Sequence, residues 1–128
     1  MHSTVVFALI LTWERYVFSR RQEVVSKIKA VVLIRILDDT YKHAYRHYLL
    51  SFHPTLPVAI ASLSHAPSNA DTPIPPACVL NANDKTFTAL LKGDLSPEFA
   101  YMSGKLKIDG HMGVALKIKN LLDIAKGL

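Results

Sequence analysis

Two histidines have the spacing of metal ligands. His43 and His47 are four residues apart, which on a helix would place both imidazoles on one face, as in many zinc sites. No Glu lies between them, and a further ligand would have to come from His53 or His65 in a proline-rich stretch. We therefore interpret His43 and His47 as surface histidines and predict no metal site.

The patterns of nucleophilic and phosphate-binding chemistry are weak. Cys78 is the single cysteine, and no His or Lys close to it in sequence would lower the pKa of its thiol, so we interpret it as a small buried apolar residue. There is no Gly-rich phosphate loop and no Gly-x-Ser-x-Gly motif. The only adjacent carboxylates, Asp38 and Asp39, are explained by a turn. The sequence therefore predicts a protein with no catalytic residues and no cofactor.

The charge is basic but dispersed. Fifteen Lys and Arg oppose ten Asp and Glu, which gives a net charge of +5. The basic residues stand in ones and twos without interleaved aromatic residues, so we predict no nucleic-acid partner. One group of lysines in the C-terminal segment suits transient contact with anionic lipid headgroups, and a solvated surface is the alternative interpretation: Lys105, Lys107, Lys117, Lys119 and Lys126.

The chain is apolar for its size. Half of its 128 residues are hydrophobic, and the mean hydropathy is +0.21. This length predicts a single domain over residues 1–128. An apolar excess in so small a domain indicates an inner cavity, a partner-facing surface or a membrane contact. The lone cysteine fits an intracellular compartment, cytoplasmic or peroxisomal, although Gly127 stands where a C-terminal peroxisomal signal needs a basic residue.

The N-terminal segment, residues 1–29, is predicted to be helical. Its apolar run Val5–Leu11 is soon followed by Glu14 and Arg15, well short of the roughly 18 residues that a membrane-spanning helix requires. A secretory signal begins with a positively charged stretch, whereas the first residues of this chain carry no Lys or Arg. We expect Val5–Leu11 to form a buried or partner-facing helix.

The middle of the chain combines one clear strand with a proline-rich region. The run Ala30–Leu37 is apolar and β-branched, which predicts a strand buried on both faces. Six of the seven prolines lie between Thr40 and Ala77. Proline lacks the amide donor of a sheet ladder, so we expect at most a short edge strand at Val58–Ala61 and an irregular loop at Ser62–Pro76.

The last segment has the clearest local signals. Asn83 or Asp84, Ser96 and Gly93 have the residue types of helix caps. The expected elements are a strand at Cys78–Leu80, a helix from the Asn83–Asp84 cap to Gly93, a short helix Pro97–Met102, an alternating strand Lys105–Asp109 and an amphipathic helix Met112–Lys126.

This last segment resembles a known family. The stretches Phe87–Pro97 and Ala100–Lys117 are similar to the sterol carrier protein type 2 domain, also called nonspecific lipid-transfer protein. That family has a phenylalanine helix ending in Gly, an Asn/Ser-Pro helix, then Gly-Lys-Leu-Lys-Ile-x-Gly-(Asn/Asp)-Met and an amphipathic helix. Here His111 replaces the Asn/Asp of the pattern. A weaker similarity runs through Glu23–Val31.

The resemblance implies an α+β fold, in which helices cover a mostly antiparallel, five-stranded sheet and an apolar tunnel lies between the two layers. Residues 78–128 form the family-like half, and residues 30–77 form a divergent strand and loop region. That region lacks the glycine turns of the family, because no glycine precedes Gly93, and it is rich in Pro, His and Tyr. Two alternatives stay open: rebuilt central strands or an incomplete sheet.

The resemblance also implies a function, namely non-catalytic binding and transfer of a sterol, fatty acid, acyl-CoA or phospholipid. The residues expected to line the tunnel are apolar and come from the family-like half: Phe87, Leu90, Leu91, Phe99, Met102, Leu106, Ile108, Met112, Leu116, Ile118, Leu121 and Leu122. The alternative is a divergent interaction or structural protein without transfer activity, which docks onto a partner or onto a second copy of itself.

Overall fold

The computed structural model describes residues 15, 19, 21–40, 42–55, 59–68 and 72–125, and the predicted helix Val5–Leu11 lies outside them. The helices and strands follow in chain order: α2 (Arg21–Ile28), β1 (Val31–Leu37), β2 (Ala44–Ser51), β3 (Ala59–Leu63), β4 (Cys78–Asn83), α3 (Asp84–Lys92), α4 (Pro97–Met102), β5 (Lys107–Gly110) and α5 (Met112–Ala125).

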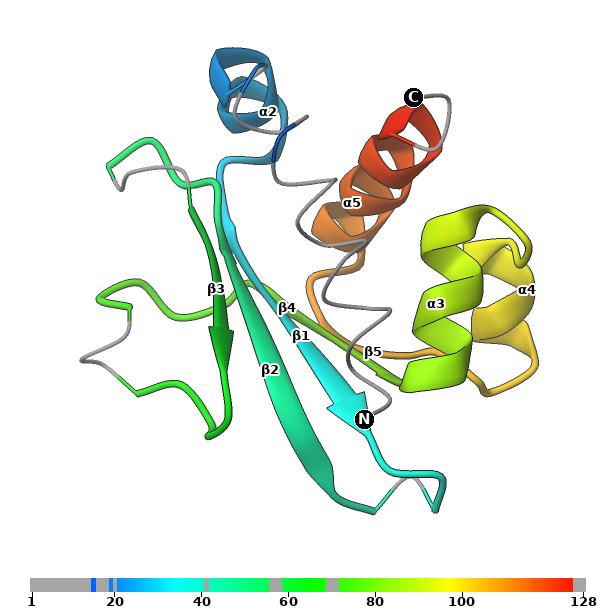
Figure 1. Ribbon diagram of the computed structural model, residues 1–128. Coiled ribbons are helices and arrows are strands. Elements are labelled where there is room, and N and C mark those ends of the chain that lie inside the picture. Colours follow the sequence, from blue (N-terminus) through cyan, green and yellow to red (C-terminus); the bar gives the residue numbers. More distant parts are fainter. Residues whose placement is uncertain are drawn as a thin grey trace.

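The strands form one five-stranded sheet in the order β3-β2-β1-β4-β5. Neighbouring strands are antiparallel except for β1 and β4, which are parallel. Figure 1 shows α3, α4 and α5 on one side of the sheet, with β3 at the far edge. The predicted α+β class with a mostly antiparallel sheet is confirmed.

Strand β1 lies at the centre of the sheet and is buried on both faces, as its sequence predicts. Val32, Ile34 and Ile36 belong to the main core beneath the helices. Val31 and Leu33 point to the opposite side, here called the outer face, where they pack with Leu49 and Ile74. The alternation of side chains along a strand therefore divides one apolar run between two cores.

The structure decides between the two alternatives for the divergent region in favour of rebuilt strands. Strand β2 pairs with β1 from Ala44 to Ser51, although its Tyr- and His-rich sequence carries no clear strand signal. Strand β3 is the edge strand expected near Val58–Ala61, and it continues to Leu63, so the loop predicted from Ser62 begins two residues too early. Proline-free segments thus supply β2 and β3.

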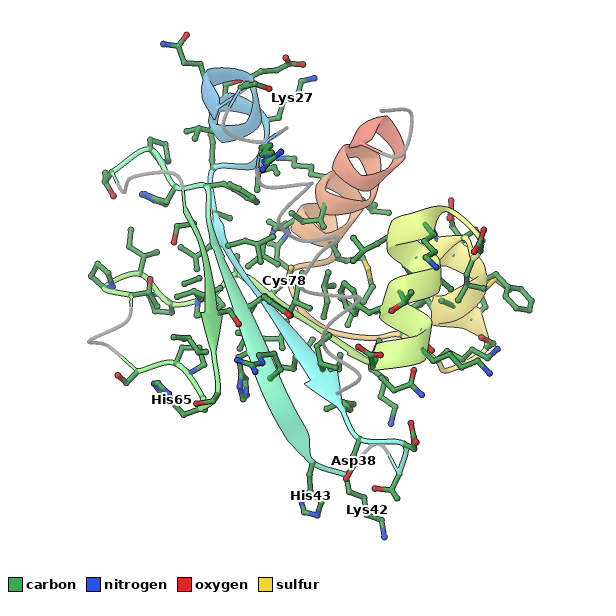
Figure 2. The ribbon with its side chains drawn as sticks, in the orientation of Figure 1. Lys27, Asp38, Lys42, His43, His65 and Cys78 are labelled. Atoms are coloured by element: carbon green, nitrogen blue, oxygen red, sulfur yellow. The ribbon has the colours of Figure 1, made fainter. Side chains whose placement is uncertain are left out.

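The turn between β1 and β2 is built without glycine. The Asp38 carboxylate accepts hydrogen bonds from the Thr40 hydroxyl at 2.7 Å and from the backbone N–H groups of Lys42 and His43 at 3.1 and 3.4 Å. Figure 2 shows Asp38, Lys42 and His43 together at this tip of the sheet. The side chain of Asp38 satisfies the backbone donors, which is the usual role of Asp in turns. The hydrogen bonds to Asp38, chiefly that from Thr40, lower the pKa of this exposed carboxyl.

The described residues of the proline-rich segment between β3 and β4 lie on the outer face of the sheet. Strand β3 lies at one edge of the sheet, and β2 and β1 separate it from β4. The connection from β3 to β4 must therefore pass over β2 and β1. Ile74 packs on the outer core, and the Thr72 hydroxyl donates to the Ile74 carbonyl at 2.8 Å. The prolines therefore cover the outer side of β1 instead of interrupting the sheet.

The family-like half folds as its capping residues predict. The Asn83 side chain caps α3 by accepting from the Thr86 N–H at 2.8 Å, and the Ser96 hydroxyl caps α4 by accepting from the Phe99 N–H at 3.1 Å. His111, which replaces an Asn/Asp, accepts from the Val114 N–H through Nδ1 at 3.4 Å at the start of α5. Within the described ranges, no helix is both long and apolar enough to cross a membrane.

Candidate functional site

An apolar cavity of about 110 Å³ lies between the sheet and the helices. Leu80 of β4 and Ile108 of β5 contribute from the sheet. Helices α3, α4 and α5 supply the rest of the wall together with Leu106: Phe87, Leu90, Pro97, Glu98, Tyr101, Met112, Ala115, Leu116 and Ile118. Glu98 is the single charged residue among these lining residues, so the cavity suits an apolar molecule.

Local sequence determines how these side chains reach the cavity. Phe87 and Leu90 are three positions apart on α3 and are 1% and 5% exposed, so both lie on its buried face. The predicted strand Lys105–Asp109 is displaced in the structure, because β5 spans Lys107–Gly110 and Leu106 lies just before it. Leu106 and Ile108 nevertheless both line the cavity, while Lys105, Lys107 and Asp109 are exposed. The predicted alternation of exposed and buried side chains is confirmed, although the strand itself begins two residues later.

Most of the residues expected to line a tunnel meet at this cavity. The structure places these seven on its wall: Phe87, Leu90, Leu106, Ile108, Met112, Leu116 and Ile118. Leu91 packs against the edge of the main core instead. Phe99 and Met102 are 59% and 84% exposed and do not line the cavity. Leu121 and Leu122 belong to α5, but their side chains lie outside the described part of the chain.

Several lining residues were not predicted from the sequence. Tyr101 lies one turn after Glu98 and Pro97 on α4, so helical spacing from Pro97 could have found it. Leu80 and Ala115 gave no such signal, because their contribution depends on how β4 and α5 pack together. The tunnel itself stays a prediction, since about 110 Å³ is well below the roughly 300–1,000 Å³ of sites for drug-sized ligands.

Three exposed apolar side chains mark the mouth of the cavity. Tyr101, Met112 and Leu116 both line the cavity and are 47%, 41% and 54% exposed. Phe99 and Met102, on the same helix as Tyr101, are exposed but do not line the cavity, and we call these five exposed residues of α4 and α5 the apolar patch. These five are the large hydrophobic residues that are exposed within the described ranges. Lys105 and Lys117, close to them in sequence, are exposed as well.

The remaining candidates for chemistry are not arranged as a reactive site. His47 lies in β2 and His43 precedes it, so four residues of extended chain, roughly 13 Å, separate them instead of one helical turn. The interpretation of His47 as a surface residue is wrong, because β1 and β3 flank it and leave it 5% exposed. Burial and the nearby Arg35 charge lower its pKa. In the described ranges, no three His, Cys, Asp or Glu side chains are close enough to hold a metal ion.

Cys78 is buried as predicted, at 1% exposure, and Figure 2 shows it in the interior, at the sheet. Burial raises the pKa of its thiol to about 11. At neutral pH the sulfur therefore stays protonated, which makes it a poor nucleophile.

A five-stranded mixed sheet, covered on one face by helices that enclose an apolar cavity, defines a small α+β domain of the sterol carrier fold. The family model of the SCP-2 sterol transfer family matches residues 16–123. The chain belongs to this family, as the resemblance of its C-terminal half indicates.

Known relatives and solved structures agree with this assignment. Human sterol carrier protein 2 is 46% identical over 44 residues, which are 34% of this chain and 8% of that protein. Peroxisomal multifunctional enzyme A of Dictyostelium discoideum is 29% identical over 104 residues, 81% of this chain and 21% of that protein. The chain therefore matches only a small part of these longer proteins.

Two solved structures illustrate the fold. The sterol carrier protein domain 2 of Helicoverpa armigera superposes with a TM-score of 0.72 at 19% identity, covering 97% of this chain and 90% of that one. A sterol carrier protein 2 of Aedes aegypti, solved as a complex with palmitate, has a TM-score of 0.55 at 16% identity and covers 80% of this chain and 93% of that one.

Proposed function

We propose that this chain, as a single domain without catalytic residues, binds the apolar part of a lipid between the sheet and the helices and exchanges it at membranes. The observation that carries the proposal is the apolar cavity, with its mouth at Tyr101, Met112 and Leu116. Each methylene moved from water into such a site contributes about 0.8 kcal/mol. Membership of the SCP-2 sterol transfer family and the palmitate complex of a protein with the same fold support it.

The cavity accommodates only part of an acyl chain at its present volume. An apolar cavity of about 150 Å³ is known to stay dry and to bind benzene, so about 110 Å³ suits a few methylene groups. Met112 and Leu116 are exposed at the mouth, and the unbranched Met side chain adapts its shape readily. We infer that these two side chains move aside when a longer chain enters.

The apolar patch is the proposed point of contact with a membrane. A lipid that leaves the cavity through its mouth at Tyr101, Met112 and Leu116 passes from one apolar surface to another. Lys105 and Lys117 add positive charge, which favours anionic headgroups. The proposed setting is intracellular, in the cytoplasm or in peroxisomes.

A titration with a fluorescent fatty acid tests lipid binding. Ala115→Phe would fill the cavity from α5, since Ala115 lines it and is 7% exposed. Lys117→Phe adds the same ring at an exposed position of the same helix and is the matched control. We expect saturable binding by the wild type and by Lys117→Phe, and at least about ten-fold weaker binding by Ala115→Phe.

A second variant keeps the test valid if overpacking prevents Ala115→Phe from folding. Leu116→Asp places a carboxylate at the mouth on a side chain that is 54% exposed, so the fold should persist while binding weakens. Saturable binding that both variants leave unchanged would refute this site. Failure of the well-folded wild type to bind would refute lipid binding altogether.

The alternative is an interaction protein that uses the apolar patch to dock onto a partner or onto a second copy and carries no lipid. The 84% exposure of Met102 is the observation that favours it. Sedimentation velocity separates the two: a concentration-dependent dimer that Met102→Glu dissolves, together with absent lipid binding, would support docking, whereas a monomer that binds fatty acid supports the carrier.

A further inference from the structure

The outer face of the sheet carries a second, larger cleft of about 420 Å³. Its floor is the sheet and its wall consists of described residues of the proline-rich segment on either side of positions 69–71, so it lies on the opposite side of the sheet from the apolar cavity. This volume falls within the range of about 300–1,000 Å³ that small-molecule sites occupy. We call it the outer cleft, and its described lining residues are Leu33, Arg35, Ala66, Pro67, Ser68, Thr72, Pro75, Pro76, Val79 and Asp109.

Arg35 supplies a half-buried guanidinium at the floor of the outer cleft. Its Nη1 donates to the Asn81 Oδ1 at 3.1 Å. Within the described part of the chain, no carboxylate forms an ion pair with Arg35. A guanidinium has five N–H donors arranged to match a carboxylate or phosphate, so most of them remain available for an anion.

Neighbouring side chains hold Arg35 in place without neutralising it. Asn81 is 5% exposed, and its Nδ2 donates to the Asp109 Oδ2 at 3.2 Å and to the Lys107 carbonyl at 3.4 Å. The Asn81 amide therefore lies between the Asp109 carboxylate and the Arg35 guanidinium. On the other flank, His47 faces Arg35 across the β1–β2 pair, and the positive charge of Arg35 helps to lower the pKa of His47.

The walls of the outer cleft are largely apolar, with two hydroxyl side chains among them. Leu33 and Val79 flank Arg35 on the sheet, and Pro67, Pro75 and Pro76 face them from the proline-rich segment. Proline has no backbone N–H, so these prolines present ring carbons to the cleft, and the contacts to an anion come from the floor. A ligand that combines one anionic group with a compact apolar body would therefore match both the floor and the walls.

We propose that the outer cleft binds a small organic anion, in which carboxylate or phosphate oxygens contact Arg35 and a ring or short apolar group packs against the prolines. This site is separate from the apolar cavity and independent of lipid binding. Asp109 also lines the outer cleft, and its negative charge lowers the affinity for an anion. Removing the charge of Arg35 and removing the charge of Asp109 should therefore have opposite effects on affinity.

An amide NMR titration with benzoate and with phenyl phosphate as separate probes tests the proposal. We expect saturable shifts at Leu33, Val79 and Asp109, which line the outer cleft, and not at Phe87 and Ala115, which line the apolar cavity. The probe that binds more tightly shows whether the cleft prefers carboxylate or phosphate. Inorganic phosphate should bind more weakly than phenyl phosphate, because it lacks a ring to contact the prolines.

Matched variants identify the anion contact. Arg35→Met should weaken binding about ten-fold or more, and Asp109→Asn should strengthen it several-fold while keeping an oxygen that accepts from Asn81. Lys42→Met removes the same charge at the tip of the β1–β2 turn, away from the cleft, and should leave binding unchanged (Figure 2).

The proposal would be overturned by shifts confined to the apolar cavity, by no saturable shifts at all, or by equal losses of affinity in Arg35→Met and Lys42→Met. Asp109 is exposed, so Asp109→Asn keeps the test decisive if Arg35→Met fails to fold. Weaker anion binding by Asp109→Asn would also count against it. Because fatty acid titration reports on the other face of the sheet, failure of lipid binding would leave this result standing.

Discussion

Gly110 lies directly opposite Cys78 in the β4–β5 pair, with its backbone at a φ of +96°. A Cβ at Gly110 would lie 2.5 Å from the Ala77 carbonyl oxygen and 3.1 Å from the Cys78 Cα. The same carbonyl accepts a hydrogen bond from the His111 N–H at 2.8 Å. The close approach of β5 to β4, which positions Ile108 at the cavity and leads into α5, therefore requires glycine at this position.

Gly110→Ala should destabilise the protein by about 2 kcal/mol or more, because it combines a positive φ with a backbone clash. Gly104→Ala is the control: its φ is +81°, but no heavy atom lies within 4 Å of the added Cβ. The control should cost only the conformational strain, about 1 kcal/mol. Urea denaturation measures both, and equal losses would contradict the close-approach argument.

Exposed Met102 allows a direct test of membrane contact. Met102→Glu should leave the free energy of unfolding nearly unchanged, because Met102 is 84% exposed. If the apolar patch inserts at the membrane surface, co-sedimentation with anionic phosphatidylserine-containing vesicles should weaken about ten-fold. Gln22→Glu makes the same charge change at an exposed position of α2 and should bind as the wild type does. Similar losses in both variants would indicate a general charge effect.

Buried His47 should make stability depend on pH. Because the folded state lowers its pKa below the ordinary value of 6.5, the unfolded chain takes up the proton first as the pH falls. Its contribution to stability is therefore intact above about pH 6.5 and is lost below it, with a slope of at most about 1.4 kcal/mol per pH unit.

His47→Phe should remove this part of the pH dependence between pH 7.5 and 5.5, as measured by denaturant unfolding at several pH values. His43→Gln changes an exposed histidine at the neighbouring turn and should retain the wild-type slope. A wild-type slope in His47→Phe would show that other groups cause the acid sensitivity.

The Cys78 thiol should react only when the protein opens. With a pKa of about 11 and 1% exposure, it should label with a disulfide reagent at pH 8 far more slowly than a free cysteine. In urea above the unfolding midpoint the rate should rise to that of an unfolded chain. Fast labelling of the native protein would contradict the placement of Cys78 in the core.

Much of the fold could be predicted because its signals are local. Asn83 and Ser96 begin helices through hydrogen bonds to residues three positions later. The β-branched run of β1 and the alternation of Leu106 and Ile108 with polar residues also predict which side chains are buried. Strand β2 could not be predicted in the same way, because Tyr- and His-rich residues become a strand there only by pairing with β1.

The sequence by itself therefore determined most elements of this protein other than β2, its family, and most of the apolar residues on the wall of the cavity. Tertiary structure alone decided which of them meet: Leu80 and Ala115 join Phe87 only when β4, α5 and α3 pack. It also assembled the outer cleft, where Asn81 contacts Arg35 over 46 positions of the chain and Asp109 over 28. Capping and periodicity act within a few residues, whereas sheet register joins distant segments, so only the register could bring those polar side chains together.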